Sequence, residues 1–113
     1  MMAFDLKAEQ EFSLERHIEK ILGTESGGDF TVACWEPGQT SPNHCHPHAT
    51  EAYFCMEGGG HMNVNGEKVN IQPGMCIVHP PGEIHEYVNG EKRSLLFRVR
   101  YGDSVESRHF EKT

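Results

Sequence analysis

Tight-turn residues divide this chain into short segments, and they limit the possible folds more than any other sequence feature does. The segments between them are rich in β-branched and aromatic residues, which is typical of the short antiparallel strands of a sandwich or barrel. Asn65-Gly66 and Asn89-Gly90 favour tight hairpins, because both central residues of a type I′ turn need a positive φ. Pairs or triplets of Gly, Pro and Asn, or of Gly alone, recur at 27–28, 37–38, 58–60, 65–66, 73–74, 81–82 and 89–90.

The sequence therefore predicts an all-β fold. Residues 9–22 contain apolar residues at helical spacing, but their Ile-rich end suits an edge strand equally well, so a short N-terminal helix and an edge strand both remain open. We expect the polar tail 103–113, with Val105 and Phe110 as its apolar anchors, to be partly mobile or to dock on a partner subunit. The expected strands are 30–36, 44–46, 52–58, 61–64, 68–71, 75–79, 84–88 and 93–101.

Size and charge exclude several classes of protein. A chain of 113 residues forms one domain, and a net charge of −7 disfavours binding to nucleic acid and to anionic membrane surfaces. The first residues lack the basic and apolar regions of a secretory signal, and no apolar run is long enough to span a bilayer. The four cysteines form no CxxC pair, so we expect reduced thiols and a cytoplasmic protein.

Histidines are concentrated in one region, where six of the 8 lie between residues 44 and 85. His44 and His46 are two residues apart, so on an extended strand both imidazoles project from the same face. Glu51 opens the next predicted strand, and His85 follows a tight turn in the second half of the chain. Two facing hairpins of a small barrel can bring these four side chains together, which predicts a metal site of three histidines and one glutamate.

These residues lie in two motifs that resemble those of the cupin superfamily. Residues 38–58 match G(X)5HXH(X)3–4E(X)6G at every fixed position, and residues 74–89 match G(X)5PXG(X)2H(X)3N. The short spacer between the motifs is similar to that of small single-domain bacterial cupins. The fixed positions are Gly38, His44, His46, Glu51 and Gly58 in the first motif, and Gly74, Pro80, Gly82, His85 and Asn89 in the second.

The resemblance implies a conical antiparallel barrel, the jelly-roll form called a double-stranded β-helix. It implies a single domain over 1–113, with an N-terminal extension at 1–25. His44, His46, Glu51 and His85 would hold one divalent transition metal per chain. These ligands suit Fe, Mn, Ni, Co and Zn alike, so the sequence does not choose among them.

With three neutral imidazoles and one carboxylate, an octahedral divalent ion keeps two adjacent open positions and a net charge near +1. We therefore expect an enzyme that acts on a small oxygenated organic acid or sugar derivative chelated to the metal, with oxygenase chemistry ahead of lyase or isomerase chemistry. The alternative is a non-catalytic module that binds or senses a metal or small ligand. Tyr53 and Tyr87 share strand parity with the ligands and are candidate catalytic hydroxyls, although packing in the core would explain them equally well.

The remaining histidines and cysteines have other expected places. We expect His48 at the surface or beside the ligands rather than bound to the metal, and His79 at the mouth of the pocket. His17, His61 and His109 are expected at the surface. We expect Cys55 to be a small buried apolar residue and Cys45 to point away from the metal.

Three further expectations concern packing. In 93–101 one face is apolar, so Arg98 and Arg100 should lie outside the barrel, paired with carboxylates or at a subunit contact rather than gripping an acidic substrate. Trp35 could line the pocket or an interface. Apolar residues in 18–22 and 95–99 exceed what one small core uses, which predicts a homodimer.

Overall fold

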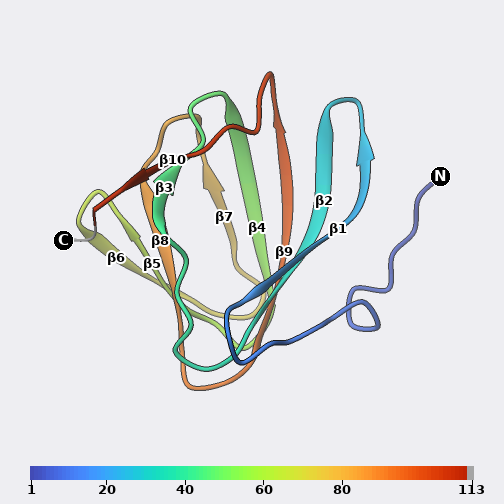
Figure 1. Cartoon of the computed structure of the whole chain (residues 1–113). Coiled ribbons are helices and arrows are strands. Elements are labelled where there is room, and N and C mark those ends of the chain that lie inside the picture. Colours follow the sequence, from blue (N-terminus) through green and yellow to red (C-terminus); the bar gives the residue numbers. More distant parts are fainter. Residues whose placement is uncertain (112–113) are drawn as a thin grey trace.

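The computed structural model describes residues 1–111 and shows two five-stranded antiparallel sheets that face each other (Figure 1). The first sheet has the order β1-β2-β9-β4-β7, and the second has the order β10-β3-β8-β5-β6. The sheets converge at the bottom of the view and spread at the top, so the expected conical barrel is confirmed. The strands are β1 (Ile18–Glu25), β2 (Gly28–Trp35), β3 (Asn43–Cys45), β4 (Ala49–Glu57), β5 (Gly60–Val64), β6 (Glu67–Ile71), β7 (Cys76–His79), β8 (His85–Asn89), β9 (Ser94–Gly102) and β10 (Arg108–Phe110).

All eight predicted strands are present, and two strands are added at the ends of the chain. The ambiguous segment 9–22 contributes to β1, an edge strand, so a short N-terminal helix is not found among residues 1–111. The described part of the tail pairs with β3 of the same chain through β10, whereas mobility or docking on a partner was expected. Residues 112–113 of that expectation lie outside the described residues. No helix in the described part of the chain has the length and apolar character to cross a membrane.

The two Asn-Gly pairs have different outcomes. Asn65 and Gly66 have φ values of 51° and 80° and join β5 to β6, as the hairpin prediction requires. The prediction for Asn89-Gly90 was wrong, because Asn89 belongs to β8, whose neighbours are β3 and β5 rather than the next strand. Its buried side-chain amide donates to the carbonyls of Glu36 at 3.0 Å and Lys92 at 2.8 Å. These hydrogen bonds stabilise the connection from β8 to β9, which passes from one sheet to the other.

The orientation of β9 is the opposite of the one expected. Arg98 is only 2% exposed, and the face of β9 that carries Arg98 and Arg100 points into the barrel. The alternate face of the strand is apolar, and Leu95 packs there with Leu6 and Phe12 of the N-terminal segment. The N-terminal segment thus covers part of the apolar outer face of β9, which is why the apolar pattern did not identify the inner face.

Charged partners make the buried position of Arg98 tenable. Its Nη2 donates to Asp29 Oδ1 at 2.9 Å and to Thr31 Oγ1 at 3.1 Å, and its Nη1 lies 3.3 Å from Glu19 Oε2. A buried guanidinium needs such partners, because an unpaired buried charge loses its hydration without compensation. Below this charged layer the interior is apolar. That core comprises Ala33, Trp35, Tyr53, Cys55, Met62, Ile71, Tyr87 and Leu96.

Replacement of Arg98 by Met should destabilise the fold by about 3 to 5 kcal/mol, because Asp29, Glu19 and Glu51 would each lose a positively charged neighbour. Urea unfolding followed by circular dichroism measures this difference. Lys7→Met is the control, since the Lys7 and Glu57 side chains are 72% and 47% exposed and water screens their pair. Equal stability of the two variants would contradict the importance of the buried network.

Candidate metal centre

The four predicted ligands meet inside the wide part of the barrel, and they come from both sheets. His44 on β3 lies directly opposite His85 on β8, and His46 follows β3 by one residue. Glu51 lies on β4 of the facing sheet and is 1% exposed. The site therefore bridges the interior of the barrel from one sheet to the other.

Three of these side chains form a close cluster, and His46 lies beside it near Glu51. Glu51 Oε1 lies 3.4 Å from Nε2 of His85 and 3.5 Å from Nε2 of His46. The candidate ligand atoms of His44, Glu51 and His85 all lie within 4.8 Å of one another. The ring of His44 is 4.5 Å from that of His85 and 5.2 Å from that of His46, centroid to centroid.

Backbone carbonyls fix the tautomer of each of the three imidazoles. Nδ1 of His44 contacts the carbonyl of Pro42 at 2.7 Å, and Nδ1 of His85 contacts that of Glu83 at 2.9 Å. Nδ1 of His46 lies 3.3 Å from the carbonyls of both Val105 and Glu106. A carbonyl only accepts hydrogen bonds, so each Nδ1 carries the proton and each Nε2 presents a lone pair, as in histidines that ligate metals.

Unpaired buried atoms show that these residues fit a cation. Both carboxylate oxygens of Glu51 and Nε2 of His85 are buried without a hydrogen-bond partner among the described residues. Burial would raise the pKa of Glu51, but His85, His46 and Arg98 hold that pKa below its usual value. Burial also lowers the pKa of His44 to about 4, so its imidazole stays neutral and able to ligate at neutral pH.

The two buried arginines lie on the other side of the Glu51 carboxylate. Glu51 Oε2 is 3.8 Å from Arg98 Nε and 3.7 Å from Arg100 Nη1. Arg100 also pairs with Asp29 at 3.1 Å. Oε1 of Glu51 thus faces the imidazoles and Oε2 faces the guanidiniums, which leaves Oε1 as the oxygen directed at a metal.

A cavity of about 260 Å³ opens beside the ligands. Its wall includes His44, His46, His85, Arg98 and Arg100. Both candidate catalytic tyrosines also lie on this wall, which places them beside the ligands as expected.

The two tyrosines differ in their hydroxyl environment. The hydroxyl of Tyr87 donates to Asn89 Oδ1 at 2.8 Å, and burial raises the pKa of Tyr87 to about 12. Burial also raises the pKa of Tyr53, whose ring lies directly across the strand pair from Arg98. Both phenols are therefore protonated at neutral pH, so each can donate a hydrogen bond or a proton to a substrate but does not serve as a general base in its ground state.

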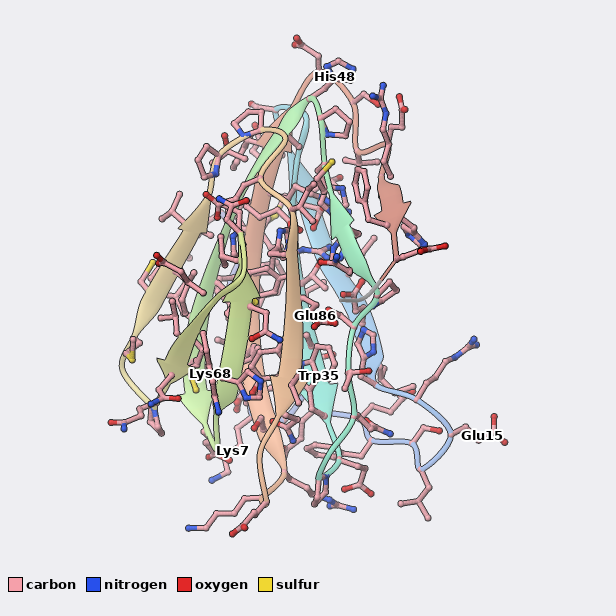
Figure 2. All side chains as sticks on the ribbon, turned by 90° about the vertical axis from the view of Figure 1, so that its left-hand side faces the viewer. Lys7, Glu15, Trp35, His48, Lys68 and Glu86 are labelled. Atoms are coloured by element: carbon pink, nitrogen blue, oxygen red, sulfur yellow. The ribbon has the colours of Figure 1, made fainter. Side chains whose placement is uncertain are left out.

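Other sequence expectations are resolved here. His48 is exposed at the tip of the molecule (Figure 2), and Cys55 is part of the apolar core. His79 was expected at the pocket mouth but is 2% exposed, and its ring stacks on that of His85 at 3.7 Å with an angle of 4°. Its Nδ1 bonds Glu83 at 2.8 Å. His79 therefore lies behind a ligand and supports the orientation of that ligand's ring.

Sequence reasoning missed two parts of the cavity wall. His17, expected at the surface, stacks on Trp35 with 3.9 Å between the rings, and Trp35 lines the cavity rather than an interface. A hydrogen bond from His17 and the charge of Arg98 lower the pKa of Glu19 to about 2. His109 belongs to the tail that covers the cavity, with its ring 6.1 Å from that of His44. Neither histidine lies in a motif, so no sequence signal marked them.

Removal of one ligand imidazole should weaken metal binding strongly, whereas removal of an imidazole outside the site should not. His44→Ala, His46→Ala and His85→Ala should each lower the affinity for Co²⁺ by at least about 100-fold, because each removes a coordinating nitrogen. His48→Ala is the matched control, since His48 is exposed. Titration of the metal-free protein measures the affinities. Equal losses in His48→Ala and His46→Ala would contradict the ligand assignment.

Comparisons with known proteins identify relatives of this chain. The chain is 28% identical over 61 residues to gentisate 1,2 dioxygenase 1 of Aquipseudomonas alcaligenes, which covers 54% of this chain and 18% of that protein. It is 27% identical over 74 residues to quercetin 2,3-dioxygenase of Bacillus subtilis, which covers 62% of this chain and 22% of that protein. The chain thus spans about a fifth of the length of these two curated relatives.

The fold also matches solved structures. A protein with a double-stranded β-helix domain from Klebsiella pneumoniae superposes with a TM-score of 0.89 at 20% identity, over 99% of both chains. The sequence pattern of the cupin domain matches residues 31–105, which include all four ligands and most of both sheets. The chain therefore belongs to the cupin family.

Proposed function

We propose that this protein is a metal-dependent enzyme that acts on a small oxygenated organic acid or sugar derivative chelated to the metal, with oxygenase chemistry ahead of lyase or isomerase chemistry. The observation that carries the proposal is the set of unpaired Nε2 and carboxylate atoms at the edge of a cavity. Both carboxylate oxygens of Glu51 and Nε2 of His85 are buried there without hydrogen-bond partners among the described residues. A purely structural cluster would pair these atoms, since unpaired buried polar groups are costly.

Size and charge of the cavity support the substrate class. A volume of about 260 Å³ lies just below the usual range for ligand pockets of about 300 to 1,000 Å³, which suits one small molecule. The carboxylates of Glu19, Asp29 and Glu51 face the guanidiniums of Arg98 and Arg100. With a divalent ion the local charge becomes about +1, which favours an anionic substrate.

The chain's own residues would bind and orient this substrate. Arg100 is the more accessible of the two arginines and lines the cavity, so it is placed to contact an anionic group. Tyr53 and Tyr87 are protonated and can donate to an oxygen that gains negative charge. Tyr87 would first have to release Asn89. The bound metal would polarise the substrate or, if it is iron, transfer electrons to O2.

The relatives favour oxygenase chemistry within this proposal. Two curated relatives are named dioxygenases, for gentisate and for quercetin. The matched regions are about a fifth of these much longer proteins, so their substrates are not transferred to this chain. We also propose a cytoplasmic location, because all four cysteines are free thiols and a reducing compartment preserves them.

Anaerobic loading with Fe²⁺ tests the function. The protein should bind about one ion per chain, and 2-oxo or 2-hydroxy acids should bind at least tenfold more tightly than analogues of equal size that lack the second oxygen donor, because the second contact costs no further translational freedom. Oxygen uptake then distinguishes oxygenase from lyase or isomerase activity. Tyr53→Phe should keep its iron but lose turnover by about 100-fold or more.

Each alternative outcome has a clear meaning. Equal affinity for chelating and non-chelating ligands would remove the chelation mechanism. Loss of iron from Tyr53→Phe would show that this tyrosine is structural. Tight binding without turnover of any substrate in the panel would favour the non-catalytic binding module.

We further propose that the chain forms a homodimer through the outer face of β4 and β7. The surface first expected to pair, in 18–22 and 95–99, is partly covered by the N-terminal segment, since Leu22, Leu95 and Phe97 pack with Leu6 and Phe12. Phe54, Met56 and Val78 stay exposed by 39%, 47% and 56%. They adjoin β7, the free edge of the sheet, and a two-fold axis there would pair this surface with itself.

A charge placed in this surface should therefore yield monomers. Val78→Glu should shift light scattering at micromolar concentration from the mass of a dimer to that of a monomer, because burying an unpaired carboxylate at the contact is unfavourable. Ile21→Glu is the control, since Ile21 is 59% exposed on β1 at the opposite edge. A monomeric wild-type protein would contradict this proposal.

A further inference from the structure

The three candidate ligand imidazoles differ in how far along the sequence their hydrogen-bond acceptors lie. His44 and His85 bond to carbonyls only two residues away, those of Pro42 and Glu83, so their own loops set their ring positions. His46 is different, because its acceptors are the carbonyls of Val105 and Glu106, 59 and 60 residues along the chain. The tail therefore supplies the contact that selects the tautomer of His46 with its proton on Nδ1, which leaves the lone pair of Nε2 available to a metal.

This tail crosses the mouth of the site, and we call residues 103–110 the C-terminal strap. The backbone N–H of Asp103 donates to the carbonyl of His48 at 3.1 Å at one end of the strap. At the other end β10 pairs with β3, where His109 lies opposite His44. Between these anchors Val105, Ser107 and His109 line the cavity. The strap thus contacts both the metal ligands and the space that a substrate would occupy.

Few apolar contacts hold the strap in place. Every residue from Val105 to Phe110 is exposed, and Val105 and Phe110 are 52% and 44% exposed. Neither residue belongs to the two apolar clusters of the barrel. A segment with little buried apolar surface opens at a lower free-energy cost than the core unfolds. The strap can therefore leave β3 while the barrel stays folded.

We propose that the C-terminal strap is a positioning element of the metal site, and that its docking on β3 is thermodynamically coupled to metal binding through His46. When the strap leaves, His46 loses both carbonyl acceptors, so its ring can rotate and place the proton on either nitrogen. Loss of such an acceptor costs about 10- to 100-fold in metal affinity. By reciprocity, a bound metal favours the docked strap by the same factor. This inference rests on the proposed metal site.

Two substitutions at one position separate the backbone of the strap from its side chain. His109→Pro should disrupt pairing with β3, because proline lacks the N–H donor and has a fixed φ. We expect it to weaken Co²⁺ binding about 10- to 100-fold. His109→Ala keeps the backbone and should change the affinity by less than about threefold. An equal loss in both variants would assign the effect to the imidazole of His109 and would overturn the role of the strap backbone.

Hydrogen exchange of the wild-type protein tests the reverse direction without any substitution. Saturating Co²⁺ should slow exchange of the amides of 103–110 by about tenfold or more, since metal binding favours docking. Amides of 4–12, on the outer face of the first sheet, should not change and serve as the internal control. If Co²⁺ binds but leaves exchange in the strap unchanged, the coupling is wrong and the metal site stands. If Co²⁺ does not bind at all, the metal site and the coupling both fail.

Discussion

A buried carboxylate at the centre of the barrel determines how the rest of the charged interior is arranged. Glu51 is 1% exposed, and an ionised carboxylate at such a place needs positive or hydrogen-bonding neighbours to offset its lost hydration. Arg98 and Arg100 supply positive charge on one side of it, and a cation held by the imidazoles would supply it on the other. Arg98 in turn requires Asp29 on β2 and Glu19 on β1. One acidic residue on β4 is thus linked to charged residues on three other strands of its sheet.

This chain of charges divides the barrel interior into two layers with different tasks. The apolar layer, around Trp35, Met62 and Leu96, supplies the hydrophobic stabilisation of the domain. The charged layer above it contributes little net stability, since the desolvation of paired ions offsets much of their attraction. Its contribution is a fixed arrangement of donors and acceptors around the metal ligands. The N-terminal segment supports this arrangement from outside, because it covers the apolar outer face of β9 and so lets the inner face of that strand be charged.

The sequence predicted the parts of this protein that depend on local rules. The strands between the turn residues, the hairpin at Asn65-Gly66 and the convergence of the four ligands follow from strand alternation and from motif spacing, and the structure contains all of them. It did not predict the inner face of β9, because the apolar face of this strand lies outside the barrel, where the N-terminal segment partly covers it. It also missed β10, since three residues are too few to show a pattern, and it left β1 undecided. His17 and His109 reach the cavity only through these two end strands. The features that the sequence did not predict, namely the inner face of β9 and the two histidines of the cavity wall, therefore all depend on long-range pairing.

Trp35 is the only tryptophan of the chain, and its indole forms part of the cavity wall while the flat face of His17 lies on it at 3.9 Å. The ring of Tyr87 meets the same indole edge-on at 4.7 Å. The emission of an indole depends on its immediate surroundings, and a charged imidazole in contact with the face of the indole quenches its fluorescence. The intrinsic fluorescence of this protein therefore comes from a single place, the floor of the cavity. Any molecule that enters the cavity or alters the stacked imidazole changes a signal that the protein carries without a label.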